Sequence, residues 1–258
     1  MFEAKFKNGL LFKRLIDVFK EMVISANLEC DETGILLQGM DIKYSCMLTL
    51  RISLNGFLKY ICDKQIKIRL KIQNFQTILK CSENEDQITL KSQYEDPKTL
   101  SIIFESKKRI SEFQLNLLNN DEEQFGIPFF EHNSIIKMPS IEFIKICREL
   151  ANINEYINIE TEQDKIKFSV KGEIILGHIQ MNTFYSFRPE ERVICEVIEP
   201  VNLMFEVKFL NQFNVASTLF NSITLLLSQD LPLVVEHLIE DIAILRLYLA
   251  PKIIEEQV

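Results

Sequence analysis

The sequence predicts an α+β fold built from four similar units, each consisting of a strand, one short helix and several further strands. Apolar residues alternate along most of the chain, as in half-buried strands, and change to helical spacing in four short stretches. These stretches recur at corresponding places, which is typical of internally repeated architectures. Because 258 residues suffice for two domains, we expect domains at residues 1–117 and 134–258, each of two units, with a connector at 118–133.

The first unit begins with a predicted strand at residues 2–6 and a helix at residues 9–22. The helical spacing places Phe12, Leu15, Ile16, Phe19 and Met22 on one side of this helix. Lys13, Asp17 and Lys20 fall on the opposite side, with Arg14 next to them. Strands are predicted at residues 27–30, 34–40 and 46–52, separated by turn residues.

The second unit repeats this order. Strands are expected within residues 56–71, and a short helix follows, with Ile72, Phe75, Ile78 and Leu79 as its apolar positions. Its polar side is predicted to consist of Gln73, Gln76, Thr77 and Lys80. Further strands are predicted at residues 87–91, 99–105 and 109–117.

The third and fourth units follow the connector. A strand at residues 134–138 leads to a helix for which Ser140 is the predicted N-cap. Its inward positions are Phe143, Ile146, Cys147 and Leu150, and its outward positions are Lys145, Arg148, Glu149 and Asn152. A strand at 201–206 precedes the last helix at 207–216, in which Phe209, Leu210 and Phe213 are inward and Lys208, Asn211, Gln212 and Val215 outward.

The connector has two chemically different parts. It opens with acidic and polar residues, which should lie on the surface because buried unpaired carboxylates are costly. It closes with Phe125, Ile127, Phe129 and Phe130, which are too apolar for an ordinary solvated linker. We interpret it as a connector that is also a docking surface; the alternative is a loop whose aromatic residues pack into their own domain.

The charge distribution limits the possible partners. A net charge of −8 argues against a protein whose outer surface binds nucleic acid, since phosphate binding requires Lys and Arg. The first three helices nevertheless carry cations on their exposed sides, and the fourth carries one at its start, so a basic helical face is expected on an acidic molecule. Asp17, Glu21 and Glu149 make this face only moderately positive, which suits contacts to phosphates without base readout.

Membrane, secreted and metal-binding classes are not favoured. No apolar run approaches the roughly 20 residues needed to cross a bilayer, and the first residues lack the features of a signal peptide. Six scattered cysteines without a CxxC pair indicate thiols in a reducing compartment. We therefore expect an intracellular protein with no metal and no cofactor.

Enzymatic classes find little support. The sequence has no phosphate-binding, dinucleotide-binding, zinc-protease or serine-hydrolase motif, and its three histidines, His132, His178 and His237, are far apart. The acidic pairs Glu85-Asp86, Glu122-Glu123 and Glu240-Asp241 leave a metal-dependent hydrolase open as an alternative, although such pairs are more often turn residues. We therefore predict no catalytic residues.

Several stretches closely resemble proliferating cell nuclear antigen (PCNA), the eukaryotic family of DNA sliding clamps. In the first half they are Met1-Phe2-Glu3-Ala4, Leu37-Gln38-Gly39-Met40-Asp41, Ile78-Leu79-Lys80-Cys81 with Asn84-Glu85-Asp86, and Gln124-Phe125-Gly126-Ile127-Pro128. In the second half they are Met138-Pro139-Ser140 with Glu142-Phe143, Ile146-Cys147-Arg148-Glu149-Leu150, Pro232-Leu233-Val234-Val235-Glu236, and Leu249-Ala250-Pro251-Lys252-Ile253. The resemblance runs almost end to end and in the same order.

This resemblance implies a sliding-clamp fold and a nuclear processivity factor. In the family, three subunits join head to tail in a homotrimeric ring with helices lining the hole and sheets outside. The ring encircles duplex DNA without sequence preference and has no membrane partner. The DNA-facing cations implied here are Lys13, Arg14, Lys20, Lys80, Lys145, Arg148 and Lys208.

The resemblance also implies two protein-binding surfaces. PIP-box peptides of DNA polymerase, clamp loader, flap nuclease and ligase would bind a pocket formed by Met40, Tyr44, Phe125, Ile127, Pro128, Pro232, Ala250 and Pro251. An apolar patch with acidic residues around it suits an aromatic-anchored peptide with basic flanks. Subunits would join along two edge strands, at about 108–117 and 174–183, through Arg109, Ile110, Phe113, Leu115, Leu176, Ile179 and Met181.

This sequence departs from the family pattern at three kinds of position. Thr77, Asn152 and Val215 replace basic or imidazole side chains that face the hole, which predicts a weaker grip on DNA. Gln163 replaces the lysine that the family modifies with ubiquitin or SUMO, and Lys165 and Lys167 lie nearby. Ser45, Met47 and His132 are expected to alter the rim of the peptide pocket. An alternative to the homotrimeric clamp is therefore a divergent paralogue that acts in repair or checkpoint response, in a mixed ring.

Overall fold

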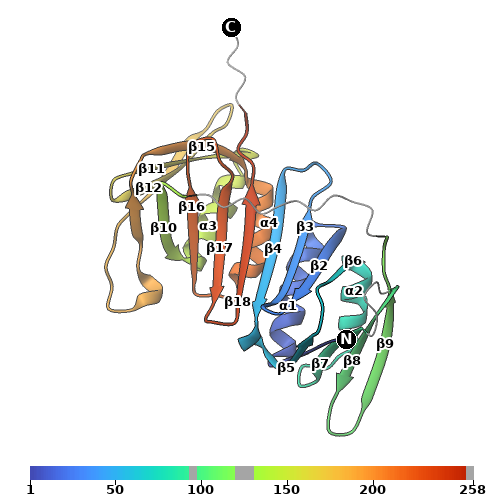
Figure 1. The fold of residues 1–258 in the computed structure, drawn as a ribbon. Helices are drawn as coiled ribbons and strands as arrows, with labels where there is room; N and C mark the ends of the chain where they lie inside the picture. The colour runs from blue at the N-terminus through green and yellow to red at the C-terminus, as the bar shows by residue number, and fades with distance from the viewer. Residues whose placement is uncertain (93–97, 120–130, 254–258) are drawn as a thin grey trace. The chain divides into compact units, whose positions relative to one another are not determined.

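The computed structural model describes residues 1–92, 98–119 and 131–253, and its contacts divide the chain into two compact units. Unit 1 comprises Met1–Gly126 together with Leu238–Leu245, and unit 2 comprises Ile127–His237 together with Arg246–Val258. Figure 1 shows both units with most of their helices and strands labelled. The predicted domain limits and connector stay a prediction, because most of the connector lies outside the described residues.

Unit 1 contains two antiparallel sheets and two α-helices. One sheet has the strand order β5-β1-β7-β8-β9, and the order β4-β3-β2-β6 forms the other. Their bounds are β1 Phe2–Phe6, β2 Ser25–Asp31, β3 Gly34–Met40, β4 Cys46–Ser53, β5 Phe57–Cys62, β6 Ile66–Lys71, β7 Gln87–Ser92, β8 Thr99–Glu105 and β9 Ile110–Asn116. The helices are α1 Gly9–Met22 and α2 Ile72–Leu79, and a 3-10 turn, η1, occupies Leu54–Gly56.

Unit 2 repeats this plan. The strand order β13-β12-β11-β15 forms one sheet, and β14, β10, β16 and β17 lie side by side in another. Their bounds are β10 Ser134–Pro139, β11 Tyr156–Glu162, β12 Lys165–Lys171, β13 Leu176–Asn182, β14 Ile194–Val197, β15 Val201–Glu206, β16 Ser222–Leu227 and β17 Leu233–Ile239. The helices are α3 Ser140–Ala151 and α4 Val207–Ser217, a 3-10 turn, η2, occupies Pro189–Glu191, and the last strand is β18, Ala243–Leu249.

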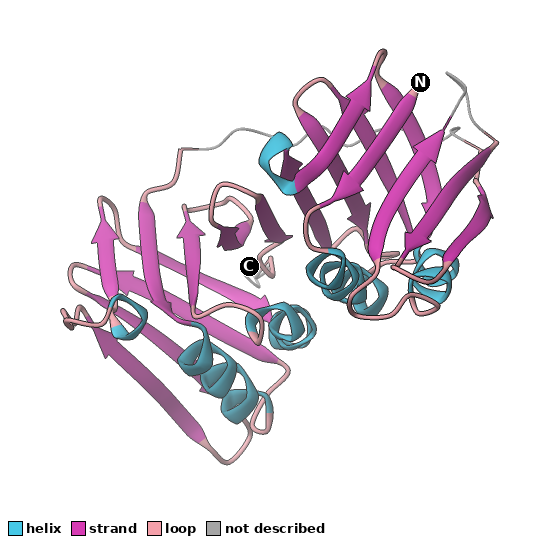
Figure 2. Cartoon of the chain, turned by 90° about the horizontal axis from the view of Figure 1, so that it is seen from below, coloured by secondary structure: helices cyan, strands magenta, loops and turns pink. Residues whose placement is uncertain are grey.

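In each unit the two α-helices lie side by side against one face of the strands (Figure 2). Alternation along the strands explains this layering, because it sends every second side chain to the helix-covered core. Phe2, Ala4 and Phe6 of β1 are buried, whereas Glu3 and Lys5 lie between them on the opposite face. The core of each unit is therefore enclosed between its sheets and its own helix pair.

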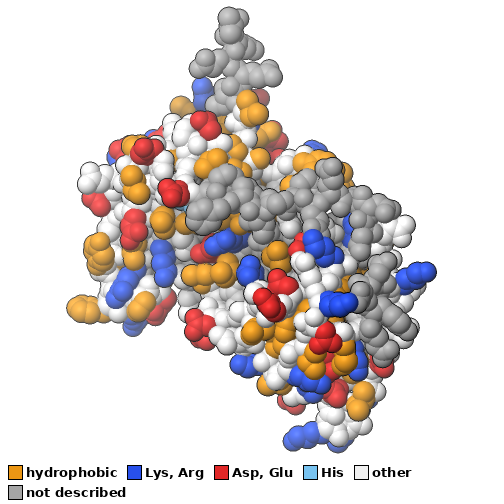
Figure 3. Space-filling model, viewed as in Figure 1, with side chains coloured by type: hydrophobic (Ala, Val, Ile, Leu, Met, Phe, Trp, Pro, Cys, Tyr) orange, Lys and Arg blue, Asp and Glu red, His pale blue; other side chains and the backbone are white. Residues whose placement is uncertain are grey.

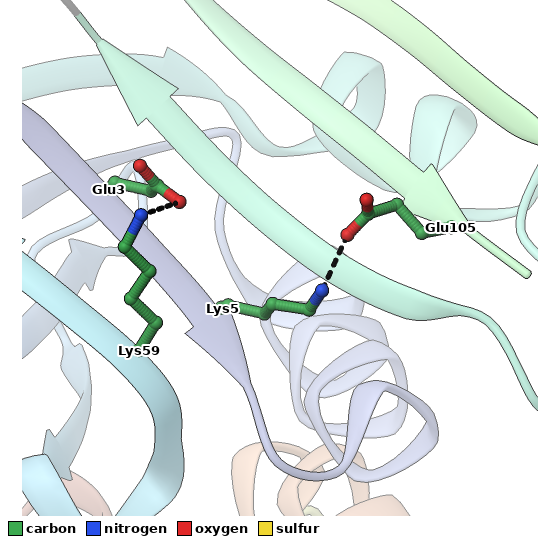
Figure 4. Close-up of polar contacts among 4 residues, drawn as sticks. All are labelled: Glu3, Lys5, Lys59 and Glu105. Atoms are coloured by element: carbon green, nitrogen blue, oxygen red, sulfur yellow. Dashed lines mark hydrogen bonds and ion pairs between the residues drawn. The ribbon is translucent and has the colours of Figure 1, made fainter.

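The opposite face of β1 carries two ion pairs that cross neighbouring strands. Lys5 Nζ lies 2.6 Å from Glu105 Oε2, reaching past β7 to β8, and Lys59 Nζ lies 2.9 Å from Glu3 Oε1 (Figure 4). On the surface seen in Figure 3, acidic and basic side chains are likewise interspersed. Because Lys5 and Lys59 are each paired with a carboxylate, this face of the β1 sheet has little positive potential with which to bind phosphate.

The helices and strands whose bounds were predicted lie within about two residues of those observed, whereas no bounds were predicted for β11, β12, β14, β16, β17 and β18. The helix at residues 9–22 and the strands at 34–40, 99–105 and 201–206 have the predicted bounds. The region at 56–71 differs at its start, because residues 54–56 form a 3-10 turn before β5 begins.

Two predicted details of the helices were wrong. Ser140 is not an N-cap: α3 begins at Ser140, Pro139 occupies the cap position, and no side chain caps the helix. Gln76 is not on the polar side of α2 but is 6% exposed. Its side-chain amide faces α1 and donates a hydrogen bond to the carboxylate of Asp17. None of the helices in the described part of the chain is long and apolar enough to span a membrane.

Candidate nucleic-acid interface and partner surfaces

Helix α1 supplies the cations of the helical face in unit 1. Asn8 caps the helix by accepting a hydrogen bond from the Leu11 amide at 2.9 Å, which fixes its start. Its apolar side is buried in the unit core, so Arg14 and Lys20 are exposed on the other side. Lys20 Nζ lies 3.6 Å from Glu21, and this exposed pair reduces the local positive charge only modestly.

Lys13 differs from the other predicted DNA-facing cations of α1. Its side chain is half-buried, and Nζ donates a hydrogen bond of 2.8 Å to the carbonyl oxygen of Ser82. Lys13 therefore ties α1 to the loop that follows α2, in addition to contributing charge.

Helix α2 adds one exposed cation at its end, Lys80, which occupies the C-cap position. Thr77 contributes no charge to this face, and its hydroxyl donates to the Gln73 carbonyl at 2.8 Å within the same helix. The side-chain amide of Gln76 donates to Asp17 of α1. This bond occupies one of the carboxylates that the sequence placed on the helical face.

Unit 2 presents a similar helical face. Lys145 and Arg148 of α3 are exposed, as is Lys208 near the start of α4. Lys208 Nζ lies 3.9 Å from Glu206 and 5.1 Å from the centre of the Phe209 ring. Glu149 of α3, Asn152 at the C-cap of α3 and Val215 of α4 are exposed as predicted. Each helix pair therefore offers separated cations interspersed with single carboxylates, a distribution that can contact phosphates but reads no bases.

The unit-1 part of the predicted peptide pocket is a shallow groove beside a tight turn. The groove has a volume of about 260 Å³ and is lined in part by Met40, Ile42 and Tyr44. Asp41 holds the turn, because its carboxylate accepts from the amides of Cys46 at 2.7 Å and Lys43 at 3.1 Å. Tyr44 has a positive φ of 58° and is 69% exposed. An exposed aromatic side chain thus lies beside a groove whose lining combines apolar residues, such as Met40 and Ile42, with polar ones.

The remaining predicted pocket residues fall into two groups. Pro232 and Pro251 are partly exposed and Ala250 is exposed, and all three belong to unit 2. The amide of Lys252 donates to the Met204 carbonyl at 2.7 Å, and its Nζ lies 3.4 Å from the centre of the Tyr156 ring, which holds this end of the chain against β15 and β11. Phe125, Ile127 and Pro128 lie outside the described residues.

The three residues predicted to alter the pocket rim have different surroundings. Met47 was wrongly placed there: it is 6% exposed, and its sulfur accepts a hydrogen bond from Gln38. Ser45 is partly exposed in the turn. Burial, together with the nearby Arg246 guanidinium, lowers the pKa of the half-buried His132 below its usual value.

The two predicted subunit-joining strands both lie at sheet edges. β9 ends one sheet of unit 1 and β13 ends one sheet of unit 2, and within the described residues each is paired along one side only. Ile110 is 71% exposed and Leu176 is 74% exposed at these edges. Three more of the predicted residues are partly exposed: Phe113, Ile179 and Met181. Arg109 donates to Ser111 Oγ at 2.8 Å. Leu115 is already buried within its own unit.

The predicted modification region forms the exposed tip of the β11–β12 hairpin. Gln163 is exposed there, next to Asp164, which has a positive φ of 63°. Lys165 and Lys167 form ion pairs with Glu162 at 2.7 Å and Glu160 at 2.8 Å. The two lysines therefore have carboxylate partners on their own hairpin.

The acidic pairs do not assemble a catalytic centre in the part of the chain described. Asp86 is buried and accepts the Glu83 amide at 2.8 Å, as a turn residue does, and Glu240 lies in the turn between β17 and β18. Glu122-Glu123 lies outside the described residues. Among those described, no group of three or more His, Cys, Asp or Glu side chains is placed to hold a metal ion.

Comparison with protein-family models accounts for both units. Residues 1–124 match the model described as proliferating cell nuclear antigen, N-terminal domain, and residues 126–252 match the one described as proliferating cell nuclear antigen, C-terminal domain. The chain belongs to the PCNA family. The PCNA family consists of DNA sliding clamps and processivity factors of DNA replication and repair, which are not enzymes. The four helices and antiparallel sheets have the two-domain PCNA clamp fold.

One surface feature is not predicted by the sequence pattern. Phe184, Tyr185 and Phe187 lie between β13 and β14 and are all exposed. The signal was visible as three aromatic residues within four positions, followed by an Arg-Pro pair and two glutamates. Without the fold, such a cluster is indistinguishable from a core strand.

Proposed function

We propose that this PCNA-family chain forms a homotrimeric ring that encircles duplex DNA in the nucleus and recruits PIP-box proteins. The observation that carries the proposal is the pair of open sheet edges, β9 in unit 1 and β13 in unit 2. Since an unpaired edge is a template for pairing with another chain, β9 of one copy can add to β13 of the next. Such a head-to-tail joint generates a ring when its rotation closes.

The helical faces support the DNA part of the proposal. Arg14, Lys20, Lys80, Lys145, Arg148 and Lys208 are exposed on or beside the four helices, and Lys13 is half-exposed. Lys and Arg that neutralise phosphates release counterions and so hold DNA without reading its sequence. A ring adds topological retention, which allows a tethered polymerase to stay at high effective concentration near its template.

The outward Tyr44 and the groove beside Met40 support peptide recruitment. An exposed aromatic side chain beside an apolar depression is a typical anchor for short peptide motifs. We propose that the groove, Pro232, Ala250, Pro251 and the connector residues Phe125, Ile127 and Pro128 together receive PIP-box peptides of polymerase, clamp loader, flap nuclease and ligase.

A second candidate function is a divergent paralogue that enters a mixed ring for repair or checkpoint response. The observation in its favour is the uncharged character of Thr77, Asn152 and Val215 on the helical faces. Sedimentation of the purified chain separates the two candidates. A homotrimer at micromolar concentration supports the first; a monomer that assembles only with other clamp chains supports the second.

The decisive experiment loads the protein onto closed circular DNA with its clamp loader and then linearises the circle. A ring held by topology is retained on the circle and is released after cutting. If retention is the same on circular and linear DNA, the protein binds the surface of DNA and the encircling proposal is wrong.

A further inference from the structure

Unit 2 carries a cluster of exposed aromatic side chains in the loop that follows its edge strand β13. Phe184, Tyr185 and Phe187 are 56%, 78% and 105% exposed. They lie in residues 183–193, the connection between β13 and β14, which runs down the lower left of Figure 1. In Figure 3, hydrophobic side chains project from that region among charged ones. Apolar groups gathered in this way commonly mark an interaction site.

The connection that carries these aromatic residues is an ordered loop. Phe184 and Val193 exchange backbone hydrogen bonds of 2.8 and 3.0 Å at its base. Nearer the tip, Arg192 Nε donates to the Ser186 carbonyl at 2.8 Å, and Ser186 Oγ donates to Glu191 at 2.9 Å. Arg188 pairs with the same carboxylate at 3.1 Å. The aromatic rings are therefore held in water by their own loop, at a cost in free energy that binding a partner would offset.

A groove adjoins the loop at its 3-10 turn, η2. Its volume of about 660 Å³ lies within the range of about 300–1,000 Å³ typical of ligand pockets. Its apolar surface comes from α3 and the end of α4. Ile141 of α3 is 70% exposed there. Its lining residues include Ile141, Glu142, Glu190, Glu191, Ser217 and Phe220.

The charge of the groove selects one kind of partner. Three of its lining residues are carboxylates, Glu142, Glu190 and Glu191, and no Lys or Arg is among the lining residues described. Arg188 engages only Glu191 among them. The groove thus combines apolar side chains with three carboxylates, which complements a basic peptide and repels DNA and acidic segments.

Phe220, which lines the groove, packs on a buried ring that is itself held by hydrogen bonds. The Phe220 ring packs on the buried His237 ring with centres 4.9 Å apart. His237 is fixed by Ser217 Oγ at 2.9 Å and by the Ser222 carbonyl at 3.1 Å. A wall held in this way is formed before any ligand arrives, so less ordering entropy is lost on binding.

We propose that this groove and the aromatic loop form a second protein-docking site, which binds a peptide segment carrying an aromatic or branched apolar anchor flanked by Arg or Lys. The anchor enters the groove beside Ile141 and Phe220, the basic flanks meet Glu142 and Glu190, and Phe187 covers the segment from the loop. The residues that line this groove differ from those of the groove beside Met40 and Tyr44, so the two surfaces can be tested independently.

The test is selection of random 12-residue peptides displayed on phage against the purified full-length protein, with excess PIP-box peptide present to block the other pocket. We expect enrichment of sequences with Phe, Leu or Trp next to Arg or Lys. The enriched peptide is then synthesised and titrated by fluorescence anisotropy. Its affinity should fall at least tenfold in Phe187→Ser and in Glu190→Lys, and should weaken with salt because basic flanks contribute.

The control is Leu58→Ser, which removes an apolar side chain that is 54% exposed on β5 of unit 1; it should leave the affinity unchanged. Circular dichroism checks that each variant is folded. Several results would overturn the proposal: no enrichment above background, enrichment of acidic peptides, or equal binding to Phe187→Ser and wild type. So would binding of phosphatidylserine vesicles that depends on Phe187, or loss of self-association in Phe187→Ser, since these assign the loop to a membrane or to a second copy of this chain.

Discussion

The side-chain amide of Gln76 in α2 donates a hydrogen bond of 2.5 Å to the carboxylate of Asp17 in α1. The bond joins the two helices of unit 1 and satisfies a carboxylate on the side of α1 that also carries Arg14 and Lys20. It thus orients Asp17 and contributes to the packing of the helix pair.

Gln76→Ala should therefore destabilise unit 1. A hydrogen bond to a charged group contributes about 1.5–3 kcal/mol, so we expect the free energy of unfolding to fall by about 2 kcal/mol in urea titrations. Gln73→Ala is the matched control, because Gln73 is an exposed glutamine of the same helix, and it should change stability by less than about 0.5 kcal/mol. Equal effects of the two substitutions would remove the inter-helix bond as the cause.

The buried His237 should make unit 2 sensitive to acid. Burial lowers the pKa of His237 from 6.5 to about 4, against a smaller opposing effect of its bond to the Ser222 carbonyl. Between these two pH values the unfolded chain binds a proton that the folded chain does not. Stability is therefore fully present above pH 6.5 and falls as the pH drops towards 4, by roughly 3 kcal/mol from this residue.

His237→Gln should flatten this part of the stability profile, although it also costs stability at neutral pH by removing the ring between Phe213 and Phe220. Leu58→Ser on β5 is the control, since it removes no titratable group, and its profile should run parallel to that of wild type. Urea titrations at half-unit pH steps measure the difference. Parallel curves for wild type and His237→Gln would contradict the assignment.

The helical cations should set the salt dependence of DNA binding. Arg14→Ala, Lys20→Ala and Arg148→Ala combined should lower the slope of log affinity against log salt by about 0.9 for each phosphate that the protein no longer neutralises. Lys59→Ala serves as the control, since Lys59 lies on the opposite sheet face and is paired with Glu3. A slope that changes as much in the control as in the helix variant would show that these helices do not face DNA.

The edge strands should determine assembly. Placing a charge at the joint, through Ile110→Asp or Leu176→Asp, should convert the trimer into monomer in sedimentation velocity runs, because each buries a carboxylate against apolar residues. Ile141→Asp is the control, since Ile141 is 70% exposed but lies on α3. Trimers that persist in both edge variants would place the joint elsewhere.

Substitution of Tyr44 should distinguish the PIP-box surface from the aromatic loop. Tyr44→Ala is expected to weaken binding of a fluorescent PIP-box peptide by roughly 1–3 kcal/mol if the ring anchors the peptide. Tyr185→Ala removes a similarly exposed tyrosine from the β13–β14 connection and should leave binding of that peptide unaffected. Anisotropy titrations of both variants check this, and the reverse pattern would assign the PIP-box peptide to the aromatic loop.

Hydrophobic periodicity predicted the helices and most strands because it reports directly which side chains enter a core. It could not predict that Gln76 is buried, since a polar side chain is tolerated inside only when a partner such as Asp17 lies opposite, and that partner comes from another helix. For the same reason the bond from Lys13 to Ser82 was not visible in sequence. The prediction that Ser140 is the N-cap was wrong by one residue, because sequence alone does not fix whether a Ser at a helix start is the cap or the first helical residue.

The two open edges also constrain how this protein evolves and fails. Joining β9 of one copy to β13 of the next is a heterologous contact, which closes on itself only when each addition turns the chain by the correct angle. A substitution that alters that angle while preserving the edges would yield open-ended filaments of folded subunits. Ageing or misassembled preparations should accordingly form fibres built from native strands, and capping a single edge should be enough to stop their growth.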